Sequence, residues 1–168
     1  MKIFEATERP SALITDLLQI WENSVRSTHT FLSESEILEI KKFVPQALAG
    51  VSRLVIATEN GRPTAFMGTE GQKLEMLFVA PEMRGKGIGK ALLLHATEKY
   101  SVNELTVNEE NPLAKGFYEH MGFTAVGRSE VDGQGNPYPV VYMKKFDKKK
   151  IPAVRAGIFY SSFRLLPR

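Results

Sequence analysis

The sequence contains no cysteine and no long apolar run. In 168 residues without cysteine, disulfides, cysteine-ligated zinc and a cysteine nucleophile are all excluded. No stretch approaches the roughly 20 apolar residues that a membrane-spanning helix needs. The first residues, MKIFEATERP, are too charged for a secretory signal. We therefore expect a cytoplasmic protein of about one domain.

The net charge of +3 is concentrated near the end of the sequence. From Asp147 onward, six basic residues and one acidic residue carry +5, which leaves residues 1–146 at −2. Because nucleic-acid binding needs basic residues gathered on one face, we expect neither a nucleic-acid nor a membrane partner for residues 1–146. Residues 147–168 mix basic and aromatic side chains. They are interpreted as a tail outside the domain, which is expected to lie on the domain itself or on a neighbouring subunit of a homodimer. The alternative is an arm for nucleic acid or an anionic membrane.

The hydrophobic pattern predicts alternating helices and strands. Apolar residues at helical spacing predict a helix over 11–25. The capping box of Ser33 and Glu36 predicts a second helix over 34–48, which Pro45 is expected to kink or end. Asn60-Gly61 predicts a hairpin turn. Further helices are expected over 88–99 and 112–120, and strands over 2–6, 52–59, 62–70, 73–80, 103–108, 123–131 and 139–146. This order predicts an α/β (α+β) fold with a mixed sheet and helices on both faces.

The most specific feature is the string RGKGIG at residues 84–89, which joins a buried strand to a helix. Glycines let the backbone approach a ligand closely, and the helix N-terminus adds positive potential. The segment therefore predicts a phosphate or pyrophosphate site. It lacks the G-x-x-x-x-G-K-[ST] string of a P-loop. It also places Lys90 where a dinucleotide-binding fingerprint requires a third glycine.

With a second motif, N-x-x-A-x-x-F-Y-x-x-x-G-F starting at Asn111, the chain resembles the GNAT superfamily of acetyl-coenzyme A-dependent N-acetyltransferases. The string at 84–89 matches that family's [QR]-x-x-G-x-[GA] motif, and the two motifs lie in the family's order and separation. The resemblance covers about residues 1–146, the expected acetyltransferase domain. Residues 20–32 and 127–139 are similar to the bacterial YjaB-type subgroup.

The resemblance implies a GNAT-like, mostly antiparallel seven-stranded sheet in which strands four and five are parallel and splayed. It also implies acetyl-CoA as cosubstrate, with the pantetheine arm paired to the strand backbone and an N–H near Val79 as oxyanion donor. Lys86 and Lys90 are expected to attract the 3′-phosphate of coenzyme A. The implied coenzyme-binding residues are Leu77, Phe78, Val79, Arg84, Gly85, Lys86, Gly87, Ile88, Gly89, Lys90 and Asn111.

For catalysis, the resemblance implies that Tyr118 protonates the departing thiolate, for which a phenol is a suitable acid. An alkyl amine is mostly protonated at neutral pH and needs a base, and Glu75 is the candidate. Without cysteine, the acetyl group is expected to pass directly to the amine. No metal is expected, because His29, His95 and His120 have no metal-ligand spacing.

The acceptor is expected to be a primary amine of a small molecule or a peptide. Trp21, His29 and Tyr138 are the candidate acceptor-binding residues, although Trp21 is equally interpretable as a core residue. Asn111 is equally interpretable as a helix cap, and Phe117 as core. The alternative function is a non-catalytic coenzyme A-binding module. Such a module would keep residues 84–89 but would not need Tyr118 or Glu75.

Overall fold

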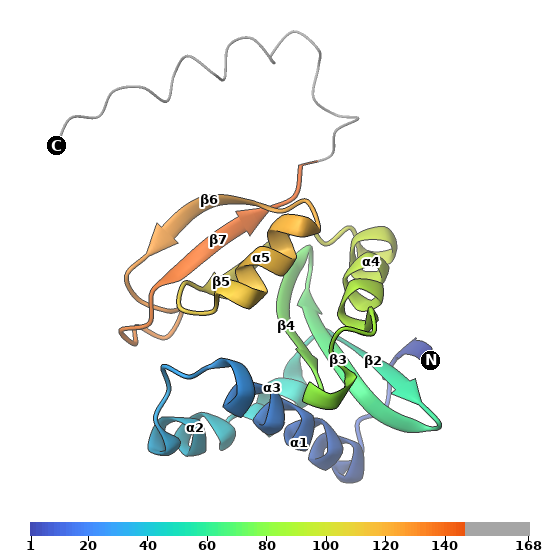
Figure 1. Cartoon of the computed structure of the whole chain (residues 1–168). Helices are drawn as coiled ribbons and strands as arrows, with labels where there is room; N and C mark the ends of the chain where they lie inside the picture. Colours follow the sequence, from blue (N-terminus) through green and yellow to red (C-terminus); the bar gives the residue numbers. More distant parts are fainter. Residues whose placement is uncertain (147–168) are drawn as a thin grey trace, which may run out of the picture.

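The computed structural model of the chain describes residues 1–146, so the proposed tail at 147–168 lies outside the described part. Seven strands form one sheet in the order β1-β2-β3-β4-β5-β7-β6 (Figure 1). All neighbouring strands are antiparallel except β4 and β5. The predicted fold class is therefore confirmed. The strands are β1 (Lys2–Glu5), β2 (Arg53–Glu59), β3 (Arg62–Glu70), β4 (Lys73–Val79), β5 (Glu104–Asn108), β6 (Thr124–Ser129) and β7 (Val140–Lys144).

The hairpin between β2 and β3 turns where the sequence predicted. Asn60 and Gly61 have φ values of 50° and 77°, and a turn with two such residues matches the twist of the flanking strands. The helices are α1 (Ser11–Thr28), α2 (Glu34–Lys41), α3 (Val44–Gly50), α4 (Ile88–Tyr100) and α5 (Pro112–His120), with a short 3₁₀-helix at Pro81–Met83. No helix within residues 1–146 is long and apolar enough to span a bilayer.

One helix prediction is wrong. The stretch 34–48 forms two helices, and Pro45 lies in the first turn of α3 instead of late in a single helix. A proline ring clashes with the carbonyl four residues earlier and offers it no N–H. That carbonyl belongs to Lys41, the last residue of α2. The proline therefore ends one helix and starts the next, a position that its fixed φ favours.

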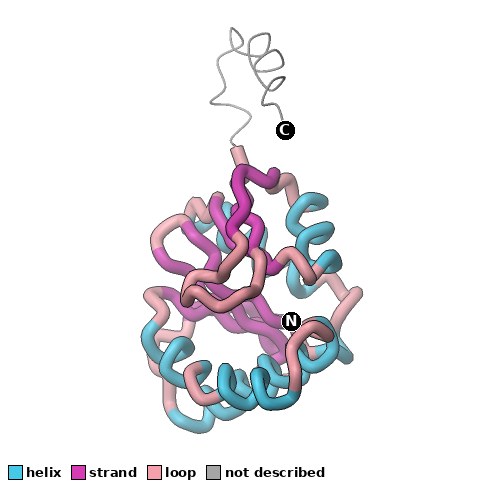
Figure 2. Tube along the Cα trace, turned by 90° about the vertical axis from the view of Figure 1, so that its left-hand side faces the viewer, coloured by secondary structure: helices cyan, strands magenta, loops and turns pink. Residues whose placement is uncertain are grey.

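Helices cover both faces of the sheet. Both α1 and α4 pack on β3 and β4, whereas any contact between the two helices is slight, so they lie on opposite faces. Figure 2 shows the strands running through the middle of the molecule with the helices around them. The core between these layers is continuous, and its fully buried side chains include Leu17, Leu54, Phe66, Leu92 and Met143.

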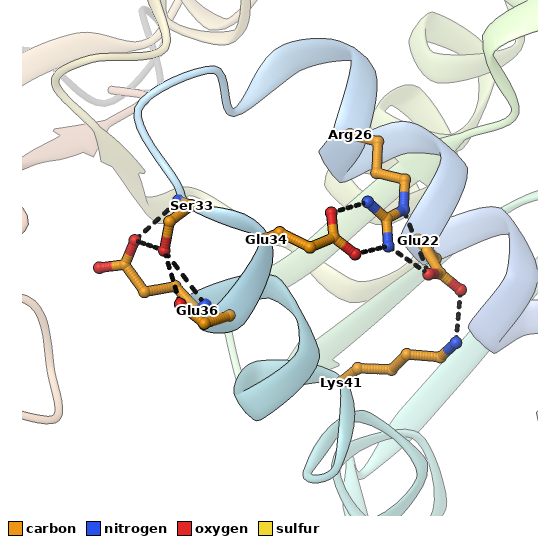
Figure 3. A network of polar contacts seen from close by, with 7 residues as sticks. Glu22, Arg26, Ser33, Glu34, Glu36 and Lys41 are labelled. Atoms are coloured by element: carbon orange, nitrogen blue, oxygen red, sulfur yellow. Dashed lines mark hydrogen bonds and ion pairs between the residues drawn. The ribbon is translucent and has the colours of Figure 1, made fainter.

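A network of ion pairs joins α1 to α2 (Figure 3). The carboxylate of Glu22 accepts from Arg26 at 2.9 Å and from Lys41 at 2.6 Å, and Arg26 also pairs with Glu34. Exposed pairs stabilise a fold only slightly. Their geometric effect is larger here, because they hold the end of α1 beside the start of α2. The connecting residues 29–33 are thereby confined between two anchored helix ends.

Candidate active site

A cavity of about 390 Å³ opens where α1, β4, α4 and α5 meet. One wall is the glycine-rich segment 84–89, and another is the end of β4. The large cavity is therefore lined by the backbone of the predicted phosphate-binding segment. Side chains of α1 and α5, which are distant from that segment in sequence, complete its lining.

The glycine-rich wall has the geometry of an anion cradle. Gly85 and Gly87 have φ values of 75° and 78°, and a Cβ built on either would meet nothing within 4 Å. The first intrahelical bond of α4 runs from the Ala91 N–H to the Gly87 carbonyl, so the N–H groups of Ile88 and Gly89 have no helical acceptor. Gly87 caps the helix without a side chain. Free N–H groups at a helix N-terminus favour a negatively charged ligand.

The charged side chains around the cradle differ in their placement. The Arg84 guanidinium donates to the Ser24 hydroxyl at 2.9 Å and thereby fastens the segment to α1. The Lys86 ammonium lies 3.4 Å from the Met83 sulfur, and Lys86 does not line the large cavity. Lys90 does line it. The structure thus brings only one of the two predicted lysines to the cavity.

Strand β4 separates from β5 soon after the two strands meet. They pair only at Lys73 with Glu104 and at Leu74 with Leu105. The predicted splay is therefore present, and the rest of β4 has an edge that faces a gap.

The backbone groups on that edge can be assigned from one hydrogen bond. The Ala80 N–H donates to the Thr64 carbonyl of β3 at 2.9 Å. Because backbone groups alternate in direction along a strand, Phe78 points its groups toward β3, whereas Leu77 and Val79 point theirs into the gap. Leu77 and Val79 thus offer strand-like donors and acceptors to an extended ligand.

A second, smaller cavity of about 130 Å³ lies beyond the gap. Six residues line both cavities, and we call them the junction: His29, Leu77, Phe78, Asn111, Ala114 and Tyr118. Glu75 lines only the small cavity. The two cavities are therefore adjacent across the junction, with the cradle beside the large one and a carboxylate beside the small one.

Tyr118 is buried at the junction, with 9% of its surface exposed. Its ring packs edge-on against Phe117 and Phe123 at centroid distances of 5.2 and 6.1 Å. Burial raises the pKa of the Tyr118 phenol, so the hydroxyl keeps its proton at neutral pH. Tyr118 lines both cavities, where its hydroxyl is placed to donate to a ligand.

Asn111 caps α5, as the sequence allowed. Its side-chain oxygen accepts from the Ala114 N–H at 3.2 Å. Because Asn111 also belongs to the junction, the structural and ligand-binding interpretations are compatible.

Glu75 is an exposed carboxylate at a β-bulge. Gly68 pairs with Met76 and Thr69 pairs with Leu74, so Glu75 is the extra residue on β4. The Lys73 ammonium lies 2.9 Å from its carboxylate. The bulge sits next to the last β4–β5 pair, so Glu75 marks the point where the two strands part.

The predicted acceptor-binding residues are separated by the structure. His29 lies at the junction, and its ring contacts Phe31, which in turn contacts Tyr138. The Tyr138 hydroxyl donates to Glu36, and this bond raises the pKa of Tyr138 to about 12. Trp21 is 6% exposed within the core and lines neither cavity, so its core interpretation is confirmed.

Several residues that line the large cavity were not predicted as site residues, among them Ser24 and Leu113. Ser24 holds Arg84, and Leu113 is 75% exposed at the large cavity. Phe117, expected in the core, also lines that cavity. In the sequence, Leu113 could have been found only as an apolar residue on the outer face of the helix that begins with the Asn111 motif. Within residues 1–146, no group of three or more histidine, aspartate or glutamate side chains is placed to hold a metal ion.

Known proteins resemble this chain over most of its length. Residues 23–145 match the family model described as acetyltransferase (GNAT) domain. The peptidyl-lysine N-acetyltransferase YjaB of Salmonella typhimurium is 42% identical over 125 residues, which are 74% of this chain and 86% of that protein. YjaB of Escherichia coli K12 is 40% identical over 126 residues, 75% of this chain and 86% of that protein. The solution structure of apo YjaB from Escherichia coli has a TM-score of 0.77 at 36% identity and covers 86% of this chain and 97% of that one.

Proposed function

The chain belongs to the GNAT family of acetyltransferases, and from this premise we propose that it transfers the acetyl group of acetyl-CoA directly to the side-chain amine of a lysine in a protein or peptide. The observation that carries this proposal is the pair of adjacent cavities that share the junction, one lined by the cradle and the other by Glu75. Such a pair accepts an anionic cosubstrate from one side and a cationic amine from the other.

The large cavity fits coenzyme A in charge and in shape. The N–H groups of Gly87, Ile88 and Gly89 would hold the pyrophosphate, where open space beside the glycines admits it. Leu77 and Val79 would bind the pantetheine amides as a neighbouring strand does. Lys90 is the lysine placed to meet a further phosphate. When bound, acetyl-CoA supplies an acetyl group activated as a thioester.

The remaining chemistry belongs to Val79 in the large cavity, Tyr118 at the junction and Glu75 in the small cavity. The Val79 N–H faces the gap and would stabilise negative charge on the carbonyl oxygen during transfer. Tyr118, kept neutral by burial, would give a proton to the departing thiolate. Glu75 would bind the arriving ammonium and take its first proton. The acid for the thiolate thus lies on the coenzyme side, and the base for the ammonium lies on the acceptor side.

A lysine side chain suits the acceptor end better than a bulky small molecule. The small cavity holds about 130 Å³, which admits a slender alkyl amine. The Glu75 carboxylate lines this cavity and would attract the cationic end of a lysine. The relatives that are 40–42% identical are named for peptidyl-lysine acetylation.

The test is turnover with a lysine peptide. Because the chain has no cysteine, a thiol reagent reports released coenzyme A without a protein background. We expect thiol release with an Nα-acetylated peptide that contains one lysine, and an acetylated ε-amine by mass spectrometry. The same peptide with arginine in place of lysine is the control.

Activity on a peptide α-amine or a small amine, with none on the lysine, would replace the acceptor class. Binding of acetyl-CoA without turnover on any amine would favour the coenzyme A-binding module over the enzyme.

A further inference from the structure

We propose that His29 is a second base of this active site, taking the proton that the acceptor nitrogen loses at the junction of the two cavities. The inference rests on the proposed function, which requires an alkylammonium ion to lose two protons before it becomes an amide. Glu75 accounts for the first of them at the acceptor end. No group has yet been assigned to the second.

The two proposed bases, Glu75 and His29, lie at different places along the site. Glu75 lines only the small cavity, where the ammonium would arrive. His29 belongs to the junction with Leu77 and Tyr118, where backbone donors and the proposed acid meet. The nitrogen must reach this point to form its bond to the acetyl carbon. His29 is therefore the base beside the reacting nitrogen at the later stage.

A neighbouring hydroxyl determines which imidazole nitrogen can accept a proton. The Thr28 hydroxyl donates to the Ser24 carbonyl at 2.9 Å, so its only hydrogen is engaged. The His29 Nδ1 lies 2.8 Å from the same Thr28 oxygen. Both contacts can form together only when Nδ1 carries the hydrogen of the second, and we infer this arrangement. In the neutral ring this leaves Nε2 unprotonated, with a lone pair able to accept a proton.

The ring is held in place from several sides. The His29 N–H caps α1 by donating to the Val25 carbonyl at 2.8 Å. Phe31 packs on the ring at a centroid distance of 5.4 Å. The α1–α2 ion pairs of Figure 3 fix the two ends of the connecting segment. A base held in this way keeps its orientation while the acceptor enters and leaves.

The charges around His29 favour its neutral form. Burial lowers the pKa of His29, and the nearby positive charge of Arg84 lowers it further. Glu75 and Tyr118 share the small cavity with the imidazole, and Lys90 shares the large one. Tyr138 faces it only through Phe31. With its lowered pKa, the imidazole is neutral at pH 7 and ready to accept a proton.

The proton balance closes with three groups. Glu75 takes the first proton from the ammonium and releases it to solvent. The nitrogen–carbon bond forms, the carbon–sulfur bond breaks, and the sulfur takes the proton of the Tyr118 hydroxyl. His29 Nε2 takes the second proton from the nitrogen and returns it to the Tyr118 oxygen. One amide and one thiol result, and one proton is released for each acetyl group transferred.

The tautomer is tested without any ligand. Nitrogen-15 NMR of the imidazole in the free protein should show a neutral ring at pH 7, protonated on Nδ1 and unprotonated on Nε2. The Thr28→Val variant should lose this preference. A ring protonated on Nε2 in the parent protein would overturn the proposal, whatever the enzyme acetylates.

Kinetics test the role itself, with lysine peptide as acceptor. His29→Gln should lower kcat by about 10²-fold with little change in acetyl-CoA affinity by calorimetry. It should also change the acid limb of the kcat–pH profile, to which Glu75 and the acceptor amine still contribute. In His29→Ala, added imidazole should restore part of the rate, which a structural role does not explain. His120→Gln changes an exposed histidine outside both cavities and should match the parent.

An unchanged kcat in His29→Gln, or no rescue of His29→Ala by imidazole, would overturn the role of His29. If the parent protein instead binds acetyl-CoA but acetylates no amine, the proposed function itself has failed. The two failures are therefore distinguishable.

Discussion

Replacing Gly87 by tryptophan should remove coenzyme A binding while the fold persists. Gly87 has a φ of 78°, and a non-glycine residue in this region is strained by roughly 1–2 kcal/mol. A domain stable by about 5–15 kcal/mol tolerates that loss. The indole would extend into the open space beside Gly87, where the pyrophosphate is proposed to sit.

The loss of affinity follows from the donors that the indole would block. A hydrogen bond to a charged group contributes about 1.5–3 kcal/mol. If two of the free N–H groups at the start of α4 are blocked, about 3–6 kcal/mol is lost, which is at least roughly 10²-fold in Kd. Calorimetry with coenzyme A measures this change, and urea unfolding measures the stability.

Gly71 provides a matched control. Its φ is 54°, and a Cβ there also meets nothing within 4 Å, but the residue lies in the turn between β3 and β4 outside both cavities. Gly71→Trp should therefore lose similar stability and keep its affinity. Equal Kd values for Gly87→Trp and Gly71→Trp would refute the placement of the cradle.

Four further predictions concern proton transfer, pH and the domain boundary. Tyr118→Phe keeps the ring packing and removes only the hydroxyl, so kcat should fall by about 10²-fold or more with acetyl-CoA affinity unchanged; an unchanged chemical rate in single-turnover measurements would move the acid role elsewhere. Glu75→Gln should lose activity at neutral pH and recover part of it as pH rises, because more of the acceptor is then already neutral; an equal loss at every pH would argue for a structural role. Hydrogen bonds from Ser33 and Tyr138 lower the pKa of Glu36 from 4.5 to about 2, so its stabilising effect is complete above pH 4.5 and declines as pH falls toward 2; urea unfolding should show the difference between the parent and Glu36→Gln shrinking over this range, and a constant difference would contradict the assignment. Removing residues 148–168 should leave acetyl-CoA binding and turnover nearly intact and lower the pI, because β7 ends at Lys144 and residues 1–146 carry −2; failure of the shortened protein to fold would place the boundary of the domain further along the chain.

Local signals in the sequence were sufficient for most secondary structure. Asn60-Gly61 specified its hairpin, and Ser33 with Glu36 specified the start of α2, because each depends on residues within one turn. The same holds for Asn111, whose side chain reaches only three residues along the chain. Pro45 was a local signal that was misinterpreted, since its effect falls on the carbonyl four residues before it.

The candidate site could be predicted only in part. The motifs at 84–89 and at Asn111 identified two walls of the large cavity, since each wall is one continuous segment. The bond from Arg84 to Ser24, 60 residues apart, has no trace in either segment. The sequence pattern shows Phe117 only as an apolar position of a helix, and this pattern is the same whether the side chain faces the core or a cavity. Side-chain exposure depends on what packs opposite, which the local pattern does not contain.

By itself, the sequence determined most of the elements, their order and the glycine-rich segment of the cradle, because these follow from conformational preferences of neighbouring residues. Only the tertiary structure decided that Trp21 is buried, that β4 parts from β5 after Leu74, and that His29 and Tyr118 line the same cavity. Each of these depends on the pairing and packing of segments that lie far apart in the chain. The free energy of a contact between two such segments depends on the residues of both, so the local sequence of either segment alone does not specify it.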